Sequence, residues 1–446
     1  MKCNYVLLII AVIGLASCQK DQPAGELDAQ LENLLSTKGG SDGINFFKMP
    51  ASNAYGQIPE DPRNPITDSK VQLGKMLFHE SGFAVKPEKE FSKNTYSCAS
   101  CHFATAGFQA GRFQGIGEGG VGFGFNGEGR QPGPLFTEAE LDVQPLRSPS
   151  AMNGAFQQVQ LWNGQFGATG LNSGLEYAFT PGTPKETNVL GYEGLEIQAI
   201  AGMGVHRQDV NETLVTDLGY KQMFDNAFPD FDPSERYTKE TAGLAIAAYE
   251  RTLLSNRAPF QKWLSGDKAA MTEAQKRGAI LFFDKAGCAD CHTGPALNSM
   301  EFYALGMGDL FDCPEEVFKA DMGLSDHKGR GGFTGNAEDD YKFKVPQLYN
   351  LKDSPFYGHG SSFRNIRSVI EYKNRAQKEN ERVPNSQLAS QFKPLGLSNS
   401  EIDDIVVFIK DGLYDPDLLR YQPSSVNSGN CIPVNDPMAK ADLGCN

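Results

Sequence analysis

Apolar residues recur at helical spacing in several stretches of the chain, whereas the alternating pattern of a half-buried β-strand is scarce. Two amphipathic helices are predicted at residues 211–228 and 234–254, and the apolar positions of the second fall close to helical spacing. Further helices are predicted near residues 366–374 and 400–413. The pattern therefore predicts a mainly α fold.

One helix-like pattern occurs twice. Residues 73–78 and 277–282 both contain Gly-x-x-Leu-Phe, and each segment is followed by a Cys-x-x-Cys-His motif. Thr272, with Gln275 three residues later, predicts a capping box at the start of the second helix. Repetition of this kind predicts two copies of one small domain. The glycine-rich residues 107–133 are expected to form an ordered loop over a cofactor.

The two Cys-x-x-Cys-His motifs carry the strongest chemical signal. This motif is the attachment signature of c-type haem, in which two thiols add to the porphyrin vinyl groups and the adjacent histidine binds the iron. A zinc site would recruit further paired ligands, and a redox Cys-x-x-Cys would lie in a βαβ pattern; the sequence shows neither. We therefore predict two haem c groups, held by Cys98, Cys101 and His102 and by Cys288, Cys291 and His292.

The formal net charge of −14 argues against nucleic acid as a partner, because phosphate binding needs clustered Lys and Arg. An acidic surface would suit a basic partner, such as a small electron-carrier cytochrome, through electrostatic steering. The same charge could serve solubility alone, so both interpretations stay open. The 446 residues are enough for two or three domains, each with a buried core.

The N-terminus has the features of an export signal. Lys2 precedes an apolar stretch at residues 5–16 that is too short to span a bilayer as a mature helix. The sequence Leu-Ala-Ser-Cys ending at Cys18 resembles a bacterial lipobox, and the polar residues that follow, to about residue 45, would form a tether. The alternative is an ordinary signal peptide with an incidental cysteine. We predict a protein of the cell envelope, on the periplasmic side, attached to a bacterial membrane only by a lipid on Cys18.

Three cysteines remain once the signal segment, the lipobox and the two haem motifs are assigned: Cys313, Cys431 and Cys445. In an oxidising compartment two of them are expected to form a disulfide. Cys431 with Cys445 closes the shorter loop, but the sequence alone leaves the pairing open.

Further segments accompany the two motifs in the order that a known family has. They are Leu73-Gly74 with Leu77-Phe78, Arg147 to Asn153, Leu161 to Gly164, Glu196 to Ala199, Tyr249 to Leu253, and Phe343 to Pro346 with Pro355 to Gly360. Over about residues 60–415 the chain thereby resembles the bacterial di-haem cytochrome c peroxidases and the related di-haem enzyme that matures methylamine dehydrogenase.

This resemblance implies two cytochrome c-like domains, each with one covalently bound haem c. Hydrogen peroxide would be reduced to water at the His102 haem, with electrons that a small donor cytochrome delivers to the His292 haem. A homodimer is expected on the same ground. The predicted units are a signal peptide (1–17), a lipoprotein tether (18–58), a first, peroxidatic haem domain (59–256), a second, electron-entry haem domain (257–420) and a C-terminal tail (421–446).

The resemblance also assigns two residues between the domains. Trp162 falls where the family has a tryptophan that relays electrons between the haems; the alternative is a packed core aromatic. Asn153 matches a side chain that helps to hold a calcium ion, with backbone carbonyls near Ser354 and Pro355 as further oxygen ligands. The alternative for Asn153 is an ordinary turn-stabilising residue.

The distal side of the first haem departs from the family in two ways. Gln198 matches the distal glutamine, but the glutamate expected some ten residues later is not evident. His206 and Arg207 could replace it as proton carrier and charge stabiliser, or they could be a surface pair. No histidine occurs between His102 and His206 to block the iron. Either the first haem is open in the diferric state, which we favour, or His206 is the blocking ligand.

The sixth ligand of the second haem is open. The peroxidases use a methionine and the maturation enzyme a tyrosine, and the corresponding position here holds Lys373, with Tyr372 beside it. The alternative for Tyr372 is a buried aromatic on a helix face. A thioether ligand raises the potential of a haem, so the identity of this residue matters for electron entry. Other candidates in the preceding loop are Met300, Met307 and Met322.

The favoured function is thus a peroxidase with a cytochrome donor. One rival is a di-haem oxidase that modifies a partner protein or an organic substrate, which the missing blocking histidine and the Tyr372 option favour. A second rival is a non-catalytic electron carrier with both irons six-coordinate.

Overall fold

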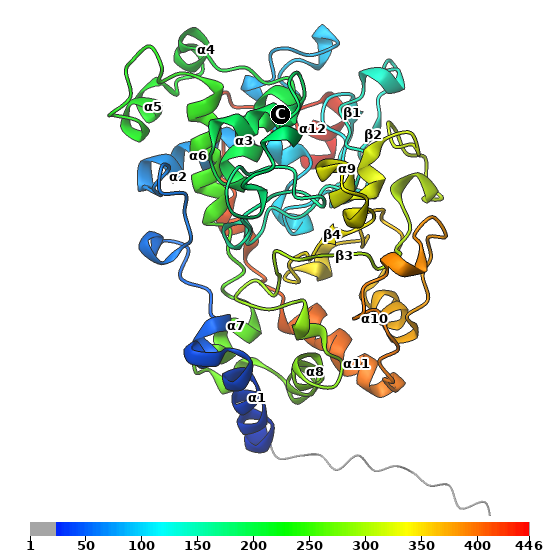
Figure 1. The fold of residues 1–446 in the computed structure, drawn as a ribbon. Helices are drawn as coiled ribbons and strands as arrows, with labels where there is room; N and C mark the ends of the chain where they lie inside the picture. Colours follow the sequence, from blue (N-terminus) through cyan, green and yellow to red (C-terminus); the bar gives the residue numbers. More distant parts are fainter. Residues whose placement is uncertain (1–23, 446) are drawn as a thin grey trace, which may run out of the picture.

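The computed structural model describes residues 24–445 and is mainly helical, which confirms the predicted class (Figure 1). The four strands are short and form two antiparallel pairs, β1 (Gly120–Val121) with β2 (Gln131–Pro132) and β3 (Phe302–Tyr303) with β4 (Phe343–Lys344). No helix in the described part of the chain is long and apolar enough to cross a membrane. The α-helices are α1 (Ala24–Lys38), α2 (Asp68–His79), α3 (Gly194–Val205), α4 (Glu212–Asp217), α5 (Lys221–Ala227), α6 (Lys239–Arg251), α7 (Pro259–Leu264), α8 (Glu273–Phe283), α9 (Arg330–Thr334), α10 (Ile366–Arg375), α11 (Asn399–Val407) and α12 (Pro437–Leu443).

The predicted helices occur, most of them with shorter bounds than predicted. The segment 211–228 is divided into α4 and α5, because Gly219 between them adopts a positive φ of 75°. The segment 234–254 contains α6, 366–374 corresponds to α10, and 400–413 is α11 followed by one π-helical turn at Phe408–Gly412. The capping box of α8 is present, since Thr272 accepts from Gln275 N and Gln275 Oε1 accepts from Thr272 N.

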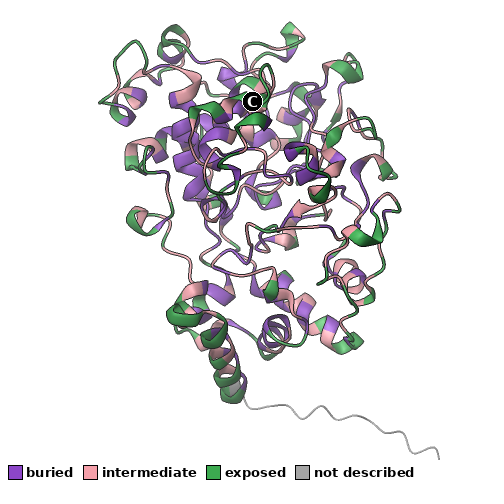
Figure 2. Cartoon of the chain, in the orientation of Figure 1, coloured by how far each residue is buried: buried purple, intermediate pink, exposed green. Residues whose placement is uncertain are grey.

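Two large hydrophobic clusters divide the helices. One contains side chains of α2, α3, α5 and α6, and Figure 2 shows buried residues concentrated around these helices. The other contains side chains of α1, α7, α8, α10 and α11, at the opposite end of the molecule in Figure 1.

The repeated Gly-x-x-Leu-Phe pattern marks the same contact in both clusters. A Cβ at Gly74 in α2 would lie 1.9 Å from the carbonyl oxygen of Ala245 in α6. A Cβ at Gly278 in α8 would lie 2.0 Å from the carbonyl oxygen of Asp404 in α11. Only glycine lets the paired helices approach this closely, so the repeat in the sequence corresponds to a repeated helix crossing.

The structure corrects the predicted polar tether. Helix α1 lies inside that segment, and Leu27, Leu31 and Leu35 are buried in the cluster of α8 and α11. Asp28 accepts a hydrogen bond from Trp263 Nε1 at 2.7 Å and forms an ion pair with Lys276 at 2.7 Å. The segment is polar in composition, but leucines at every fourth position give it one apolar face. Cys18 and the signal segment lie outside the described residues.

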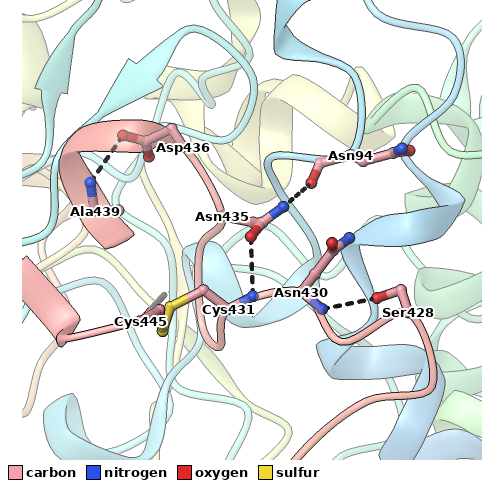
Figure 3. Close-up of a disulfide and its surroundings, with 8 residues drawn as sticks. All are labelled: Asn94, Ser428, Asn430, Cys431, Asn435, Asp436, Ala439 and Cys445. Atoms are coloured by element: carbon pink, nitrogen blue, oxygen red, sulfur yellow. Dashed lines mark hydrogen bonds between the residues drawn. A yellow bond between two sulfur atoms is a disulfide. The ribbon is translucent and has the colours of Figure 1, made fainter. Parts of the chain in front are cut away.

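The Cys431–Cys445 disulfide closes a loop in the C-terminal tail (Figure 3). It is the pairing with the shorter loop, and Cys313 has a free thiol. In this tail, Asp436 forms a buried ion pair with Arg130 of the glycine-rich segment at 3.1 Å. Asp442 accepts hydrogen bonds from two backbone N–H groups of the same segment. The tail therefore packs over the glycine-rich loop beside the first motif.

Candidate active site

Each Cys-x-x-Cys-His motif lies on a 3-10 turn, at Cys98–Ser100 and Cys288–Asp290. The Nδ1 atom of His102 is 3.1 Å from the carbonyl oxygen of Phe108, and Nδ1 of His292 is 3.0 Å from that of Leu297. A histidine that donates Nδ1–H to a carbonyl keeps Nε2 available for a metal.

Both motif histidines are neutral, as metal ligation requires. Burial lowers the pKa of each imidazole to about 4. Neutral imidazoles with a free Nε2, each beside two cysteines at haem-attachment spacing, form a donor set that fits haem iron.

A cavity of about 290 Å³ lies beside the second motif. His292, Cys288 and Cys291 line one part of it, and Trp162 and Pro149 line another. The remaining wall is largely apolar, as a porphyrin requires, with contributions from Phe282, Leu305, Val345, Leu348, Ile366, Val369, Ile370 and Ile409.

Trp162 is held rigidly in the wall of this cavity. Its Nε1 donates to the carbonyl oxygen of Arg147 at 2.8 Å, and its ring meets the His359 ring edge-on, with centroids 6.3 Å apart. His359 is in turn stacked on Phe343 at 3.7 Å and hydrogen-bonded to Asp309 at 3.2 Å. The predicted relay residue thus lies between the segment after the first motif and the cavity of the second.

Helix α3 brings Gln198 and His206 together. A Cβ at Gly202 would lie 3.8 Å from both Gln198 Nε2 and His206 Cδ2, so the two side chains flank one position of the helix surface. His206 is close enough to His102 for its charge to affect that imidazole, which places this end of α3 near the first motif.

His206 is paired with a carboxylate that the sequence did not suggest. Its Nδ1 lies 2.8 Å from Asp142 Oδ2. Burial alone would lower the pKa of His206, but the charge and hydrogen bond of Asp142 raise it above its ordinary value. Burial alone would raise the pKa of Asp142, and His206 instead holds it below its ordinary value. The imidazole keeps 33% of its side-chain surface accessible.

Arg207 is held by other carboxylates, although its charge acts on both Asp142 and His206. Its guanidinium forms an ion pair with the buried Glu118 and donates to the carbonyl oxygen of Glu140 at 2.9 Å. Glu88 contributes a second, more exposed carboxylate at 3.4 Å. Each of the two neighbours thus has its own carboxylate partner, Asp142 for His206 and Glu118 for Arg207.

The candidate ligands beside the second motif differ in orientation. Lys373 and Met307 line the cavity that His292 lines. The Tyr372 hydroxyl instead donates to the carbonyl oxygen of Leu305, and its ring packs against Phe363 and Phe392. Met300 Sδ accepts from Gln158 N, and Met322 is largely exposed.

Residues 68–269 match the family model described as di-haem cytochrome c peroxidase. Over these residues the chain is similar to this family. It is accordingly an oxidoreductase.

The relatives include both enzymes of the resemblance. The methylamine utilization protein MauG of Methylorubrum extorquens is 29% identical over 367 residues, 82% of each chain. Cytochrome c551 peroxidase of Pseudomonas aeruginosa is 26% identical over 355 residues, 79% of this chain and 81% of its own. A solved MauG-like protein associated with microbial copper homeostasis has the same fold, with a TM-score of 0.56 and 22% identity over 83% of this chain and 96% of its own.

In this chain Gln208 lies ten residues after Gln198, where the family resemblance implied a glutamate. Gln208 is 1% exposed, lies against Cys98, and its Nε2 has no hydrogen-bond partner among the described residues. The spacing from Gln198 was the signal that could have identified it. An amide cannot carry a proton as a carboxyl group does, so proton transfer needs another residue.

Asn153 has a hydrogen-bonding role in the structure. It is fully buried; its Oδ1 accepts from Ser255 N at 3.0 Å, and its Nδ2 donates to Gln347 Oε1 at 3.1 Å. Within residues 24–445 no group of three or more His, Cys, Asp or Glu side chains could hold a metal ion. Calcium binding therefore stays a prediction.

Proposed function

We propose that this enzyme reduces hydrogen peroxide to water at a haem attached to Cys98 and Cys101, with electrons that a small donor cytochrome delivers to a second haem at Cys288 and Cys291. One peroxide, two electrons and two protons give two waters. The observation that carries the proposal is the pair of His206 and Asp142 beside Gln198, because peroxide cleavage needs a group that moves a proton between the two oxygens.

The bound haem would supply the iron that exchanges electrons with peroxide. Asp142 accepts Nδ1–H of His206 and leaves Nε2 as the proton acceptor. His206 then takes a proton from one peroxide oxygen and returns it to the departing hydroxide. Gln198 orients the peroxide through its amide. Arg207 has no part in this step, since Glu118 already neutralises it.

Electrons from the second half would pass through Trp162. Its indole is fixed by the Arg147 carbonyl and lines the cavity that contains His292. Such a fixed aromatic ring can give up one electron and regain one from the donor side without a change in position.

A second candidate is the oxidation of a partner protein or organic substrate. It is favoured by the relatives named MauG and by the absence of any histidine between His102 and His206 that could block the first haem. A non-catalytic electron carrier would not need a proton-transferring pair beside the first motif.

The cellular setting is proposed from the sequence. A lipid on Cys18 would attach the enzyme to a bacterial membrane on the periplasmic side. Because α1 begins six residues after Cys18, that anchor would hold the α1 end of the molecule within about 20 Å of the lipid. A homodimer and a calcium ion near Asn153 are further expectations.

The decisive experiment is peroxide-dependent oxidation of a reduced small cytochrome c by the diferric enzyme and by enzyme pre-reduced with one electron. Rapid turnover in both forms is expected, because the first haem is open. Turnover only after reduction would show that a group blocks the iron. No turnover in either form would refute the peroxidase and favour oxidation of another substrate.

A further inference from the structure

Lys373 lies in helix α10 and lines the same cavity as His292, Cys288 and Cys291. Its charge is close enough to affect the pKa of all three. Among residues 24–445 no hydrogen bond or ion pair to its Nζ is formed, and its nearest recorded contact is the Phe392 ring at 5.9 Å.

Several other lysines in this half of the molecule have polar partners. Lys276 pairs with Asp28, and Lys352 pairs with Asp411. Lys344, which lines the same cavity and is 6% exposed, donates to Gln157 Oε1. Among the described residues Lys373 lacks such a polar partner. An ammonium group in an apolar cavity without an anionic or polar partner is unfavourable.

The apolar wall of the cavity and the lack of an ionic partner in the described chain favour the neutral amine over the ammonium at this position. A deprotonated Nζ has one lone pair and no charge, which makes it a nitrogen donor comparable to an imidazole. A metal across the cavity from His292 would give this lone pair the partner that the protein does not provide.

Tyr372 and Met307, the other candidate ligands, are less well placed than Lys373 to bind an iron held by His292. The Tyr372 hydroxyl is occupied by the Leu305 carbonyl. The Met307 sulfur lies on the loop side of the cavity, 3.5 Å from the position of a Cβ at Gly358. Lys373 combines a donor atom that has no hydrogen-bond partner among residues 24–445 with proximity to His292 and both motif cysteines.

We propose that the Nζ amine of Lys373 is the sixth ligand of the haem iron bound by His292. The inference rests on the proposed attachment of a haem at the second motif, but not on peroxide turnover. A thioether raises the potential of a haem, and an amine lacks that effect. The second haem would therefore have a lower potential than a methionine-ligated one and would need a more strongly reducing donor.

The test is the ferric EPR and optical spectrum of the two-haem protein, with haem content measured for every variant. One low-spin and one high-spin haem are expected in the unchanged protein. Lys373→Ala should convert the low-spin haem to high-spin, and added methylamine should restore it. Lys373→Arg keeps the charge but cannot ligate, so it should also lose the low-spin signal. Lys373→Met should restore low spin, raise the potential and add the far-red band of thioether ligation.

Two matched variants act as controls. Met307→Leu removes the competing sulfur, and Lys344→Met removes the other lysine of the cavity; both should keep the low-spin spectrum. A low-spin signal that persists in Lys373→Ala and Lys373→Arg, or one that is lost in Met307→Leu, would overturn the assignment. Since the readout is spectroscopic, absence of peroxide turnover would refute the proposed function and leave this ligand in place.

Discussion

The two halves of the molecule share one construction around their motifs. In each, a helix glycine contacts the backbone of a second helix, and a Cys-x-x-Cys-His turn follows. In each, the histidine Nδ1 bonds to a carbonyl a few residues later, at Phe108 or Leu297. The repeated sequence thus builds the near side of both haem sites in the same way.

The far sides differ in chemistry. The first motif faces Gln198 and the His206–Asp142 pair, which can move protons and remain accessible. The second motif opens into a largely apolar cavity, in which the Lys373 amine forms no hydrogen bond or ion pair within the described chain. These groups come from α3, from the loop at Asp142 and from α10, all outside the repeat. The comparison teaches that the motif fixes haem attachment, whereas segments distant in sequence decide whether a haem reacts or only carries electrons.

The largest effect is expected from His206→Leu, which tests the difference between the far sides of the two motifs. Loss of the proton carrier should lower peroxide turnover by about 10²–10⁴-fold, the usual contribution of general acid–base catalysis. The measurement is steady-state oxidation of reduced cytochrome c. As a control, the donor should reduce the second haem at an unchanged rate. Turnover within about threefold of the original would mean that the two halves do not differ in this way.

Leu31→Ala tests whether α1 belongs to the second half. Leu31 is fully buried in the cluster of α8 and α11, and loss of a buried leucine costs about 2–5 kcal/mol. We expect that decrease in the free energy of unfolding, measured by urea denaturation followed by far-UV circular dichroism. The exposed Gln30→Ala in the same helix should stay within about 0.5 kcal/mol. Equal effects of both variants would restore the tether interpretation.

Gly74→Ala and Gly278→Ala test the shared construction. In each variant the new Cβ would meet a backbone carbonyl near 2 Å, so the helices must separate, at a cost of about 1–3 kcal/mol. Unfolding free energies should fall by similar amounts, and each variant should perturb the spectrum of its own haem. Gly202→Ala is the control, because its Cβ meets only side-chain atoms at 3.8 Å; helix propensity predicts a gain of up to about 1 kcal/mol. An unchanged free energy of unfolding in Gly278→Ala would show that the repeated glycine does not determine the helix crossing.

The shared features could be predicted from the sequence, because each is local. The haem motifs, the capping box of α8 and most helices follow from spacing within a few residues. The differing features could not. Asp142 lies 64 residues before His206, and no periodicity links the two. Helix α1 was missed because its composition is polar overall, although leucines at every fourth position were the available signal.

The smallest effect is expected from Asp142→Asn, which keeps the shape of the pair and removes its charge. Asp142 raises the pKa of His206, while Arg207 opposes it and is itself neutralised by Glu118 and Glu88. As the proton acceptor, His206 works in its neutral form, so activity should rise as pH increases through its pKa. The variant lowers that pKa and should move the rise to lower pH. An amide also orients the imidazole less well, so turnover at the optimum should fall by about tenfold.

The pH dependence of the free energy of unfolding tests the effect of the Asp142 charge independently of activity. Because the folded-state pKa of His206 is raised, its pairing stabilises the fold below the ordinary histidine pKa, and this contribution is lost as pH rises through the raised value. The free energy of unfolding of the Asp142→Asn variant should therefore lack that decrease with pH. A pH profile and a stability profile that both stay unchanged would mean that Asp142 does not act on His206. The contrast between the two halves would then rest on Gln198 and the open iron alone.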